Sequence, residues 1–342
     1  MREPDFWYRS SSWIAQLLMP AGAIYGAITA LRMAKHGAKV GVPVFCIGNY
    51  HLGGAGKTPT TLKIADVLRS LGESPFVVSR GYGGTFRGSV RVEAERHRAK
   101  DVGDEPLMMA SKVPVIVSRD RAAGAALAIR QGASVVLLDD GFQNPSIEKD
   151  ASFIVIDSNR GVGNGLVFPA GPLRAPLSQQ VPRTDALIVI GPGRNAEAIS
   201  SAVAIMNRPV LQAKLRLDPA SALSLRGQRV LAFAGIGDPA RFFSTLRSIG
   251  ADVVEERSFP DHHAFAPRDL DAIGATASAQ CLKVVTTEKD MIRIVSDPRN
   301  SHHAKDIAML PVTLAFEDES VLRNVLAAHL LKARNPSEQF SH

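Results

Sequence analysis

The stretch Val44-Phe-Cys-Ile-Gly-Asn-Tyr-His-Leu-Gly-Gly-Ala-Gly-Lys-Thr-Pro59 decides the fold of this chain. Its apolar first part predicts a β-strand, its glycines predict a tight loop, and the apolar spacing over 60–71 predicts a helix. Backbone N–H groups of such a loop bind phosphate oxygens at a helix N-terminus. We therefore expect a nucleotide-binding loop in which Lys57 reaches the β- and γ-phosphates and the Thr58 hydroxyl holds Mg²⁺.

The loop departs at one position from the general pattern G-x-x-x-x-G-K-[ST], because His51 stands where that pattern has glycine. A glycine-rich turn that merely joins a strand to a helix is therefore the alternative to nucleotide binding. The residues that we expect to bind the nucleotide are His51, Leu52, Gly53, Gly54, Ala55, Gly56, Lys57 and Thr58.

Apolar segments that alternate with helical segments continue this pattern along the chain. The expected strands are 75–79, 113–118, 135–139, 153–157 and 186–190, with an alanine-rich helix over 121–131. Fully apolar strands separated by helices indicate a parallel sheet that is covered by helices on both faces. We therefore predict an α/β fold of the P-loop NTPase type. The pattern restarts at 229–250, which predicts a second, smaller α/β domain.

Length and composition agree with a two-domain globular protein. A chain of 342 residues exceeds what one core usually organises, and 45% hydrophobic with 21% charged residues is typical of a folded protein. The expected parts are an N-terminal membrane-associated segment (1–35), a P-loop domain (36–208), a smaller α/β domain (209–335) and a disordered tail (336–342).

Cysteine usage and charge limit the classes of partner. Cys46 and Cys281 lie far apart and outside any C-x-x-C spacing, which indicates a reducing compartment with neither a disulfide framework nor a zinc site. The net charge of +7 fits nucleic acid, an anionic membrane surface or phosphorylated substrates. Because the basic residues are scattered and no nucleic-acid-reading module is visible, nucleic acid is the least favoured of the three.

The N-terminus favours the membrane. No charged residue occurs between Arg9 and Arg32, a run of 22 residues, and a spanning helix needs about 20. Aromatic residues precede this run and cations follow it, so the positive-inside rule places the body of the protein in the cytoplasm. A helix buried in the core, a helix lying in the membrane interface and a signal peptide cleaved near Ala21-Gly-Ala23 are the alternatives. A loop that needs cytosolic ATP argues against export. Attachment to the membrane is therefore preferred, without a choice between a helix that spans the bilayer and one that lies in its interface.

Polar clusters follow several of the expected strands. Asp139-Asp-Gly-Phe-Gln143 ends an apolar strand with two acids, the form of a strand whose carboxylate binds Mg²⁺ beside a phosphate loop. Gly103-Asp-Glu-Pro106 places two carboxylates before a helix, where helix capping is the alternative reading. Thr286-Thr-Glu-Lys-Asp290 is typical of a strand-to-helix junction that caps the helix. The neighbouring side chains of His262 and His263 diverge and cannot chelate one ion, and we expect His263 to be a surface residue.

In this order and spacing, these motifs resemble the tetraacyldisaccharide 4'-kinases, the lipid A pathway kinases of Gram-negative bacteria. The resemblance covers nearly the whole chain and includes the hydrophobic N-terminal segment and the phosphate loop, whose first glycine that family also lacks. Its further motifs are Ser79-Arg-Gly-Tyr-Gly83, Gly163-Asn-Gly165, Pro169-Ala-Gly-Pro-Leu-Arg174 and Asp261-His262, beside the three clusters named above. Asn144 is a departure, since the family usually has histidine there.

The resemblance implies ATP-dependent phosphorylation of the 4'-hydroxyl of a tetraacyldisaccharide 1-phosphate, which gives lipid IV-A. It also implies that Asp104 is the general base and that His262 reaches it from the second domain when the domains close on substrate. Lys57 would neutralise charge in the transition state. The implied Mg²⁺ ligands are Thr58, Glu105, Asp139 and Asp140, and the implied substrate contacts are Arg80, Tyr82, Arg121, Gln143 and Arg174. The implied location is the cytoplasmic face of the inner membrane.

Other classes of protein remain as alternatives. A membrane-associated ATPase of the chromosome-partitioning type has a signature lysine immediately before its two glycines, and Leu52 at that position argues against it. A P-loop kinase of a small metabolite, with the N-terminal helix buried, is the second alternative. A nucleotide-binding module without catalysis is disfavoured by the number of carboxylates near the loop.

Overall fold

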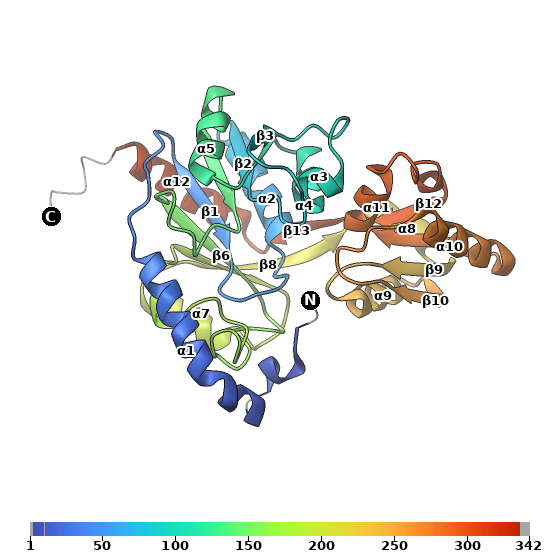
Figure 1. The fold of residues 1–342 in the computed structure, drawn as a ribbon, viewed down its shortest axis with the longest axis horizontal. Helices are drawn as coiled ribbons and strands as arrows, with labels where there is room; N and C mark the ends of the chain where they lie inside the picture. Colours follow the sequence, from blue (N-terminus) through green and yellow to red (C-terminus); the bar gives the residue numbers. More distant parts are fainter. Residues whose placement is uncertain (1–2, 10, 336–342) are drawn as a thin grey trace.

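The computed structural model describes residues 3–9 and 11–335, so the tail expected over 336–342 lies outside the described residues. Within the described ranges the strands form a nine-stranded sheet and a four-stranded sheet. Figure 1 shows them side by side, with the larger sheet and its helices on the left and the smaller sheet on the right. The α/β fold with a large parallel sheet is as the sequence predicts.

The large sheet carries the phosphate loop near its middle. Its strand order is β13-β8-β7-β6-β1-β5-β2-β4-β3, parallel except for β13 and β3 at the two edges. The strands are β1 (Val44–Gly48), β2 (Pro75–Ser79), β3 (Ser89–Arg91), β4 (Val115–Ser118), β5 (Val135–Asp139), β6 (Ala151–Asp157), β7 (Ala186–Ile190), β8 (Val210–Leu217) and β13 (Val312–Phe316). Because β5 and β6 flank β1, the residues that follow these three strands meet at one edge, where ligands of such sheets bind.

Helices cover both faces of the large sheet. The helices are α1 (Trp13–Met33), α2 (Lys57–Ser70), α3 (Ala99–Val102), α4 (Asp104–Ala110), α5 (Arg121–Arg130), α6 (Leu177–Gln180), α7 (Glu197–Ile205) and α12 (Glu319–Arg334), with 3₁₀ turns η1 (Asp5–Tyr8) and η2 (Val181–Arg183). Phe45 and Ile47 of β1 pack with α2, α4 and α12, whereas Val44 and Cys46 pack with α5 and α7 on the other face. Alternate side chains of one buried strand thus enter two separate cores.

The small sheet has its own two cores. Its parallel strands, in the order β10-β9-β11-β12, are β9 (Arg229–Ala234), β10 (Asp252–Ser258), β11 (Lys283–Thr287) and β12 (Ile307–Leu310). Its helices are α8 (Pro219–Leu225), α9 (Pro239–Ser248), α10 (Pro267–Gln280), α11 (Glu288–Val295) and the 3₁₀ turn η3 (His303–Asp306). Phe243 and Leu246 fill the core on one face, and Phe265 and Ile273 fill the core on the other.

The boundary between the sheets differs from the division expected at residue 208. Strand β8 follows that position yet pairs with β7, and β13 returns after the small sheet to pair with β8. Helix α12 then packs into the core of the large sheet through Leu322 and Leu326. The small sheet therefore lies within a chain excursion, and two strands connect it to the large sheet.

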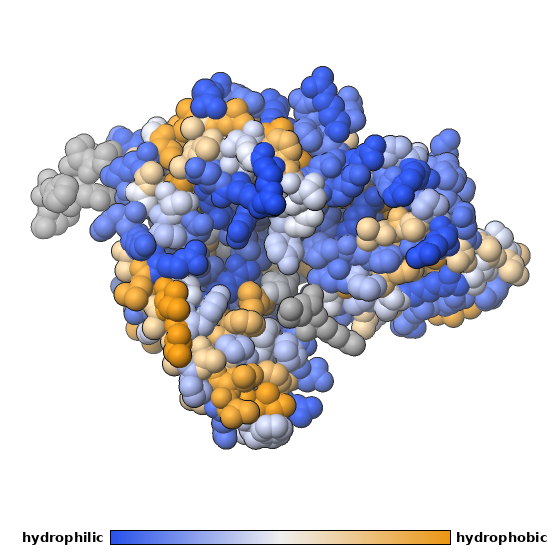
Figure 2. Space-filling model, in the orientation of Figure 1, coloured by the Kyte–Doolittle hydropathy of each residue, from blue (hydrophilic) through white to orange (hydrophobic). Residues whose placement is uncertain are grey.

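Helix α1 lies on the outside of the molecule, along the lower left of Figure 1. It packs through small residues, since a Cβ on Gly22 would lie 2.8 Å from the carbonyl oxygen of Val167 and one on Gly26 would touch Pro176. Its large apolar side chains point away, and Leu17 and Leu31 are 70% and 71% exposed. Figure 2 shows hydrophobic surface along this helix. The alternative of a helix buried in the core is therefore wrong.

Candidate active site

The phosphate loop joins β1 to α2, as the sequence predicts. Gly53 and Gly56 have φ angles of 97° and 87°, a left-handed backbone that favours glycine. The Asn49 amide donates to the Gly53 carbonyl at 3.1 Å, and the Thr60 hydroxyl donates to the Gly56 carbonyl at 2.9 Å. These contacts hold the loop at the start of α2, where Lys57 is the first helical residue.

His51 has a structural place in this loop. Its backbone forms an isolated β-bridge with Leu173, and its imidazole Nδ1 donates to the Leu52 carbonyl at 2.8 Å. Burial lowers the pKa of His51 to about 4, so the ring is neutral at physiological pH. A buried neutral ring thus occupies the position where the general pattern has glycine.

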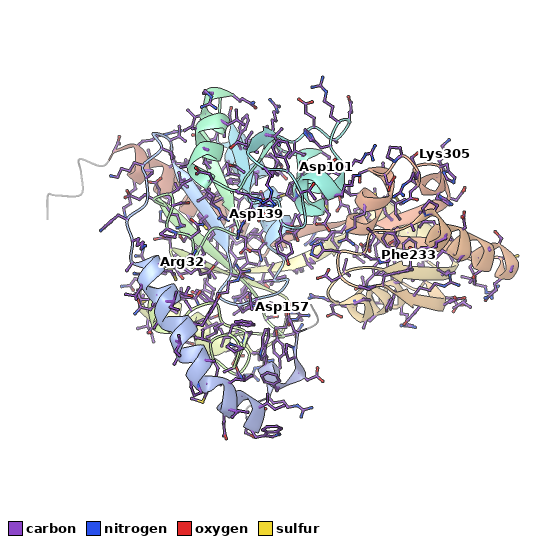
Figure 3. All side chains as sticks on the ribbon, in the orientation of Figure 1. Arg32, Asp101, Asp139, Asp157, Phe233 and Lys305 are labelled. Atoms are coloured by element: carbon purple, nitrogen blue, oxygen red, sulfur yellow. The ribbon has the colours of Figure 1, made fainter. Side chains whose placement is uncertain are left out.

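Two adjacent carboxylates at the end of β5 have opposite environments. Asp140 accepts two hydrogen bonds from Arg174, at 2.7 and 3.0 Å, and lies 3.7 Å from the Lys57 ammonium. Burial opposes ionisation of Asp140, but Lys57 and Arg174 lower its pKa to about 2. Asp139 accepts a hydrogen bond from Ser79 at 3.0 Å, and burial, Glu105 and Asp140 raise its pKa to about 6. Figure 3 places Asp139 near the middle of the molecule.

The residues beside the loop fit a nucleotide-bound Mg²⁺. The Oδ1 atom of Asp139 is buried and makes no hydrogen bond within the described part of the chain. Across residues 3–9 and 11–335, no group of three or more His, Cys, Asp or Glu side chains is arranged as a metal cage. Mg²⁺ takes one or two carboxylates together with phosphate oxygens and water, so a cage is not required. The unpaired Oδ1 atom of Asp139 is the kind of donor such an ion uses.

The two carboxylates of the Asp104-Glu105 pair begin α4 after Gly103, whose φ of 93° allows the sharp entry into the helix. Asp104 is buried, and His262 Nδ1 lies 3.0 Å from its Oδ2 atom. The hydrogen bond to Asp104 raises the pKa of His262. Although burial of Asp104 opposes ionisation, His262 and Arg293 hold its pKa well below the usual range.

Both carboxylates of this pair have a partner in the unit of the small sheet. Asp104 contacts His262. Glu105, an expected Mg²⁺ ligand, is instead paired with Lys289 of α11, which lowers the pKa of Glu105 against the effect of burial. Basic residues of α11 therefore contact both carboxylates.

Arg293 is the site residue that sequence reasoning missed. It lies in α11 and donates to Asp104 from Nε at 2.8 Å and also from Nη2. Its Nη1 atom donates to Asp290 at 2.6 Å and to the Gly235 carbonyl at 2.7 Å. The signal in the sequence was the spacing of Lys289 and Arg293, because residues four apart lie on one face of a helix.

The residues expected to contact the substrate lie in different places. Arg80 and Tyr82 are exposed, and the Tyr82 ring is 5.8 Å from the His262 ring. Arg174 is bound to Asp140. Gln143 donates to the carbonyl of Asn49 at 2.8 Å and to Gln180 at 2.9 Å. Arg121 is buried and donates to the carbonyls of residues 139 and 140, so it holds the turn after β5 and faces no open surface.

Two further residues have structural contacts. His263, expected at the surface, is stacked on Phe259 at 4.7 Å and lies 3.1 Å from Asp269. His263 is therefore a half-buried residue whose ring has structural partners. The Asn144 side chain accepts a hydrogen bond from the Ser146 backbone at 2.8 Å, a local turn that explains how the amide is used at this position.

A phosphate loop between β1 and α2, a lysine at the helix start and carboxylates at the end of the adjacent strand define a P-loop phosphotransferase. A sequence model of the family described as tetraacyldisaccharide-1-P 4'-kinase (LpxK) matches residues 14–331. The chain belongs to this family.

Individual relatives agree with that assignment. The tetraacyldisaccharide 4'-kinase of Nitrobacter winogradskyi is 57% identical over 98% of this chain and 99% of its own length. That of Rhodopseudomonas palustris (strain BisB5) is 56% identical over both full lengths. The crystal structure of LpxK from Aquifex aeolicus in complex with ATP matches with a TM-score of 0.72 and 26% identity, over 93% of this chain and 99% of that one.

Proposed function

We propose that this chain transfers the γ-phosphate of ATP to the 4'-hydroxyl of a tetraacyldisaccharide 1-phosphate, at the edge of the large sheet between the phosphate loop and Asp104. The names of its relatives and the ATP complex of the Aquifex enzyme support the reaction. The observation that carries the site is the contact of 3.0 Å between the buried Asp104 and the partly exposed His262, which joins the units of the two sheets.

The phosphate loop and its neighbours bind ATP in this proposal. Residues 51–58 surround the phosphates with backbone N–H groups, and Lys57 neutralises charge on the transferring group. Asp140 and Arg174 keep the Lys57 ammonium in place, because Asp140 contacts both cations. Thr58 and Asp139 would hold Mg²⁺, which would supply electrostatic stabilisation of the phosphates. Asp140 and Glu105 are further candidate ligands.

Asp104 accepts the proton of the sugar hydroxyl. The 4'-oxygen bonds to the γ-phosphorus, the bond to the β–γ bridging oxygen breaks, and ADP leaves. A carboxylate that is buried and hydrogen-bonded to His262 stays ionised and oriented for this task. Phosphoryl transfer has a loose transition state, so orientation matters more than a strong base.

The glycolipid head group approaches from the exposed side of this pair. Arg80 and Tyr82 are free to contact an anionic sugar there, since both are exposed and Tyr82 lies against His262. Gln143 and Arg174 line the loop side. Arg121 acts only through the backbone turn that it holds.

Helix α1 keeps this site at the lipid surface. Its packing face consists of small residues, and its bulky apolar side chains are exposed on the opposite face, which suits a helix that lies in the membrane interface. The cations that follow the helix support a location on the cytoplasmic side of the inner membrane.

One assay tests the reaction. The purified chain is incubated with ATP, Mg²⁺ and the disaccharide 1-phosphate lipid, and mass spectrometry is used to detect one added phosphate. We expect phosphorylation of the lipid that stops when Mg²⁺ is chelated. Transfer to nucleosides or small sugars, with none to the lipid, would identify a kinase of small metabolites instead.

A further inference from the structure

Arg293 reaches the site from the small sheet. Its side chain is almost completely buried, and a planar guanidinium can donate in several fixed directions at once. Two of its nitrogens donate to Asp104 Oδ2, and the third donates to Asp290 and to the Gly235 carbonyl. The residue therefore joins the start of α4 in one unit to β9 and α11 in the other.

The guanidinium is itself held in one orientation. Asp290, which is completely buried, accepts hydrogen bonds from the Gly235 backbone at 3.1 Å and from the Thr287 hydroxyl at 2.7 Å. One carboxylate oxygen of Asp290 is fixed in this way, and the other accepts from Arg293 at 2.6 Å. A fixed donor can fix its acceptor, so Arg293 determines the orientation of the Asp104 carboxylate.

The same arginine also connects to His262. The Gly235 carbonyl that accepts from Arg293 also accepts from the His262 backbone N–H at 3.1 Å. His262 has a left-handed backbone with φ of 60°, a conformation that its surroundings must hold in place. Arg293 thus contacts one member of the catalytic pair directly and supports the turn that carries the other.

The hydrogen bonds at Asp104 distinguish its two oxygens. Oδ2 accepts from His262 and twice from Arg293, whereas Oδ1 accepts only from the Glu105 backbone N–H, at 2.9 Å, among the described residues. A carboxylate oxygen has two lone pairs, so Oδ1 retains one for a substrate hydroxyl. We propose that Arg293 is a positioning residue for phosphoryl transfer, which occupies Oδ2 and presents Oδ1 of Asp104 to the 4'-hydroxyl. The inference rests on the proposed role of Asp104 as proton acceptor.

A merely stabilising ion pair is the alternative. Buried salt bridges contribute little net stability on average, so burial does not by itself explain this residue. An arginine beside a general base also lowers its basicity. That cost is acceptable only where orientation decides the rate, as it does for a loose transition state. The two roles therefore predict different kinetics.

The test compares Arg293→Lys and Arg293→Met with Arg299→Met in the full-length enzyme. Arg299 is an exposed arginine of the same unit, and its one ion pair among the described residues is with Asp297, so it controls for the loss of a charge. We expect Arg293→Met to lower kcat about 10- to 100-fold with KM for ATP unchanged, because misplacement of a reacting group has effects of this size. Arg293→Lys keeps the positive charge but not the planar guanidinium, so its kcat should lie between those of Arg293→Met and the wild type. The kcat of Arg299→Met should match that of the wild type.

A double-mutant cycle with Asp104→Asn separates the inference from the function on which it rests. If Arg293 acts through Asp104, adding Arg293→Met to Asp104→Asn should produce no further loss of kcat. Multiplicative losses of kcat in the double variant would overturn the positioning role. Arg293→Lys is the variant to use if Arg293→Met fails to fold, and a wild-type kcat of Arg293→Lys would overturn the role as well. Near-normal turnover of Asp104→Asn alone would instead reject Asp104 as the proton acceptor.

Discussion

Asp139 and Asp140 are adjacent in the chain, yet their carboxyl groups are held in opposite states. Asp140 lies between Lys57 and Arg174, which lower its pKa to about 2 against the effect of burial. Asp139 is buried and faces the negative charges of Glu105 and Asp140, which raise its pKa to about 6. Neighbouring acids with separated pKa values are a mark of functional sites, because a charge held without a local partner is normally costly.

Removal of the Asp139 charge should therefore stabilise the fold and also stop the reaction. The pKa of Asp139 is about 6 in the fold against an ordinary 3.8, so its ionisation weakens the fold as pH rises from about 4 to 6, and the full cost is present above pH 6. At pH 8 Asp139→Asn should melt at a higher temperature than the wild type, with a free energy of unfolding larger by an amount on the order of 2 kcal/mol. Near pH 4 the variant and the wild type should melt at the same temperature.

Turnover of Asp139→Asn should fall by orders of magnitude, since the proposed Mg²⁺ ligand is lost. Addition of Mg²⁺ and ATP should raise the melting temperature of the wild type more than that of the variant. A variant less stable than the wild type at pH 8 would contradict the assigned environment of Asp139.

Lys57→Ala should lower turnover by orders of magnitude while the fold remains intact, because it removes the charge that stabilises the transferring phosphate. Steady-state kinetics and circular dichroism measure the two effects. Lys63→Ala is the matched control, since Lys63 lies in the same helix but pairs with Glu319 outside the loop. Near-normal turnover of a folded Lys57→Ala protein would remove the loop from the mechanism.

The histidine pair 262 and 263 allows a comparison of neighbours. Asp104→Ala and His262→Ala should each lower turnover strongly with little effect on ATP binding, and the double variant should be scarcely worse than the poorer single one. His263→Ala should instead reduce stability, because it removes packing on Phe259 and a contact with Asp269, and should leave kcat within a few-fold. A larger loss of kcat from His263→Ala than from His262→Ala would reverse the assignment.

At the scale of residues, the sequence predicts chemistry better than it predicts partners. The apolar run ahead of Lys57 and the apolar run ahead of Asp139 each stop at polar residues, so the sequence alone shows where these two strands end. Arg293 does not follow an apolar strand, and its spacing from Lys289 indicates a shared helix face but not the partner. Its partner Asp104 lies 189 residues away in the chain, and only the packing of α11 against α4 brings them together.

At the scale of elements, local patterns again account for what could be predicted. The strand, loop and helix around Gly56 occur where apolar spacing and glycine place them. The division at residue 208 fails for β8 and β13, since no periodicity within a strand states which distant strand it pairs with. Their pairing joins segments roughly 100 residues apart, and it determines how the small sheet is attached.

Helix α1 supplies the prediction at this scale. The substitutions Leu17→Gln, Ile24→Gln and Leu31→Gln together should release the protein from vesicles of inner-membrane lipid and raise KM for the lipid substrate. The reason is that these exposed side chains form the face available to the bilayer, and each would contribute about 2 kcal/mol on insertion. Vesicle sedimentation and kinetics measure the two effects, with melting temperature expected to stay unchanged.

The packing face of the same helix provides the control. Gly22→Leu should lower the melting temperature, because its Cβ would lie 2.8 Å from the Val167 carbonyl oxygen. If the triple glutamine variant still sediments with vesicles, another surface binds the membrane.

At the scale of the whole molecule, the two sheets meet along α4 and α11. Asp104 at the start of α4 contacts Arg293 near the end of α11, whereas Lys112, just after α4, contacts Glu288 at the start of α11 at 2.9 Å. Ion pairs therefore lie at both ends of α4 where it contacts α11. The strands β8 and β13 form the other connection between the units, as Figure 1 shows.

The Lys112–Glu288 pair tests whether this contact sets the catalytic geometry, because neither residue belongs to the site. Lys112→Glu and Glu288→Lys should each lower kcat several-fold, since like charges push α4 from α11 and thereby displace Asp104 from His262 and Arg293. The combination of both reversals restores opposite charges and should recover most of the loss. The same swap at Lys63 and Glu319, an ion pair within the large-sheet unit, is the control and should leave kcat unchanged. Additive losses in the Lys112–Glu288 double variant would mean that the two residues act separately. The approach of the helices would then depend on the buried pair Asp104–Arg293 and the half-buried pair Glu105–Lys289, which the enzyme could not lose without losing the site itself.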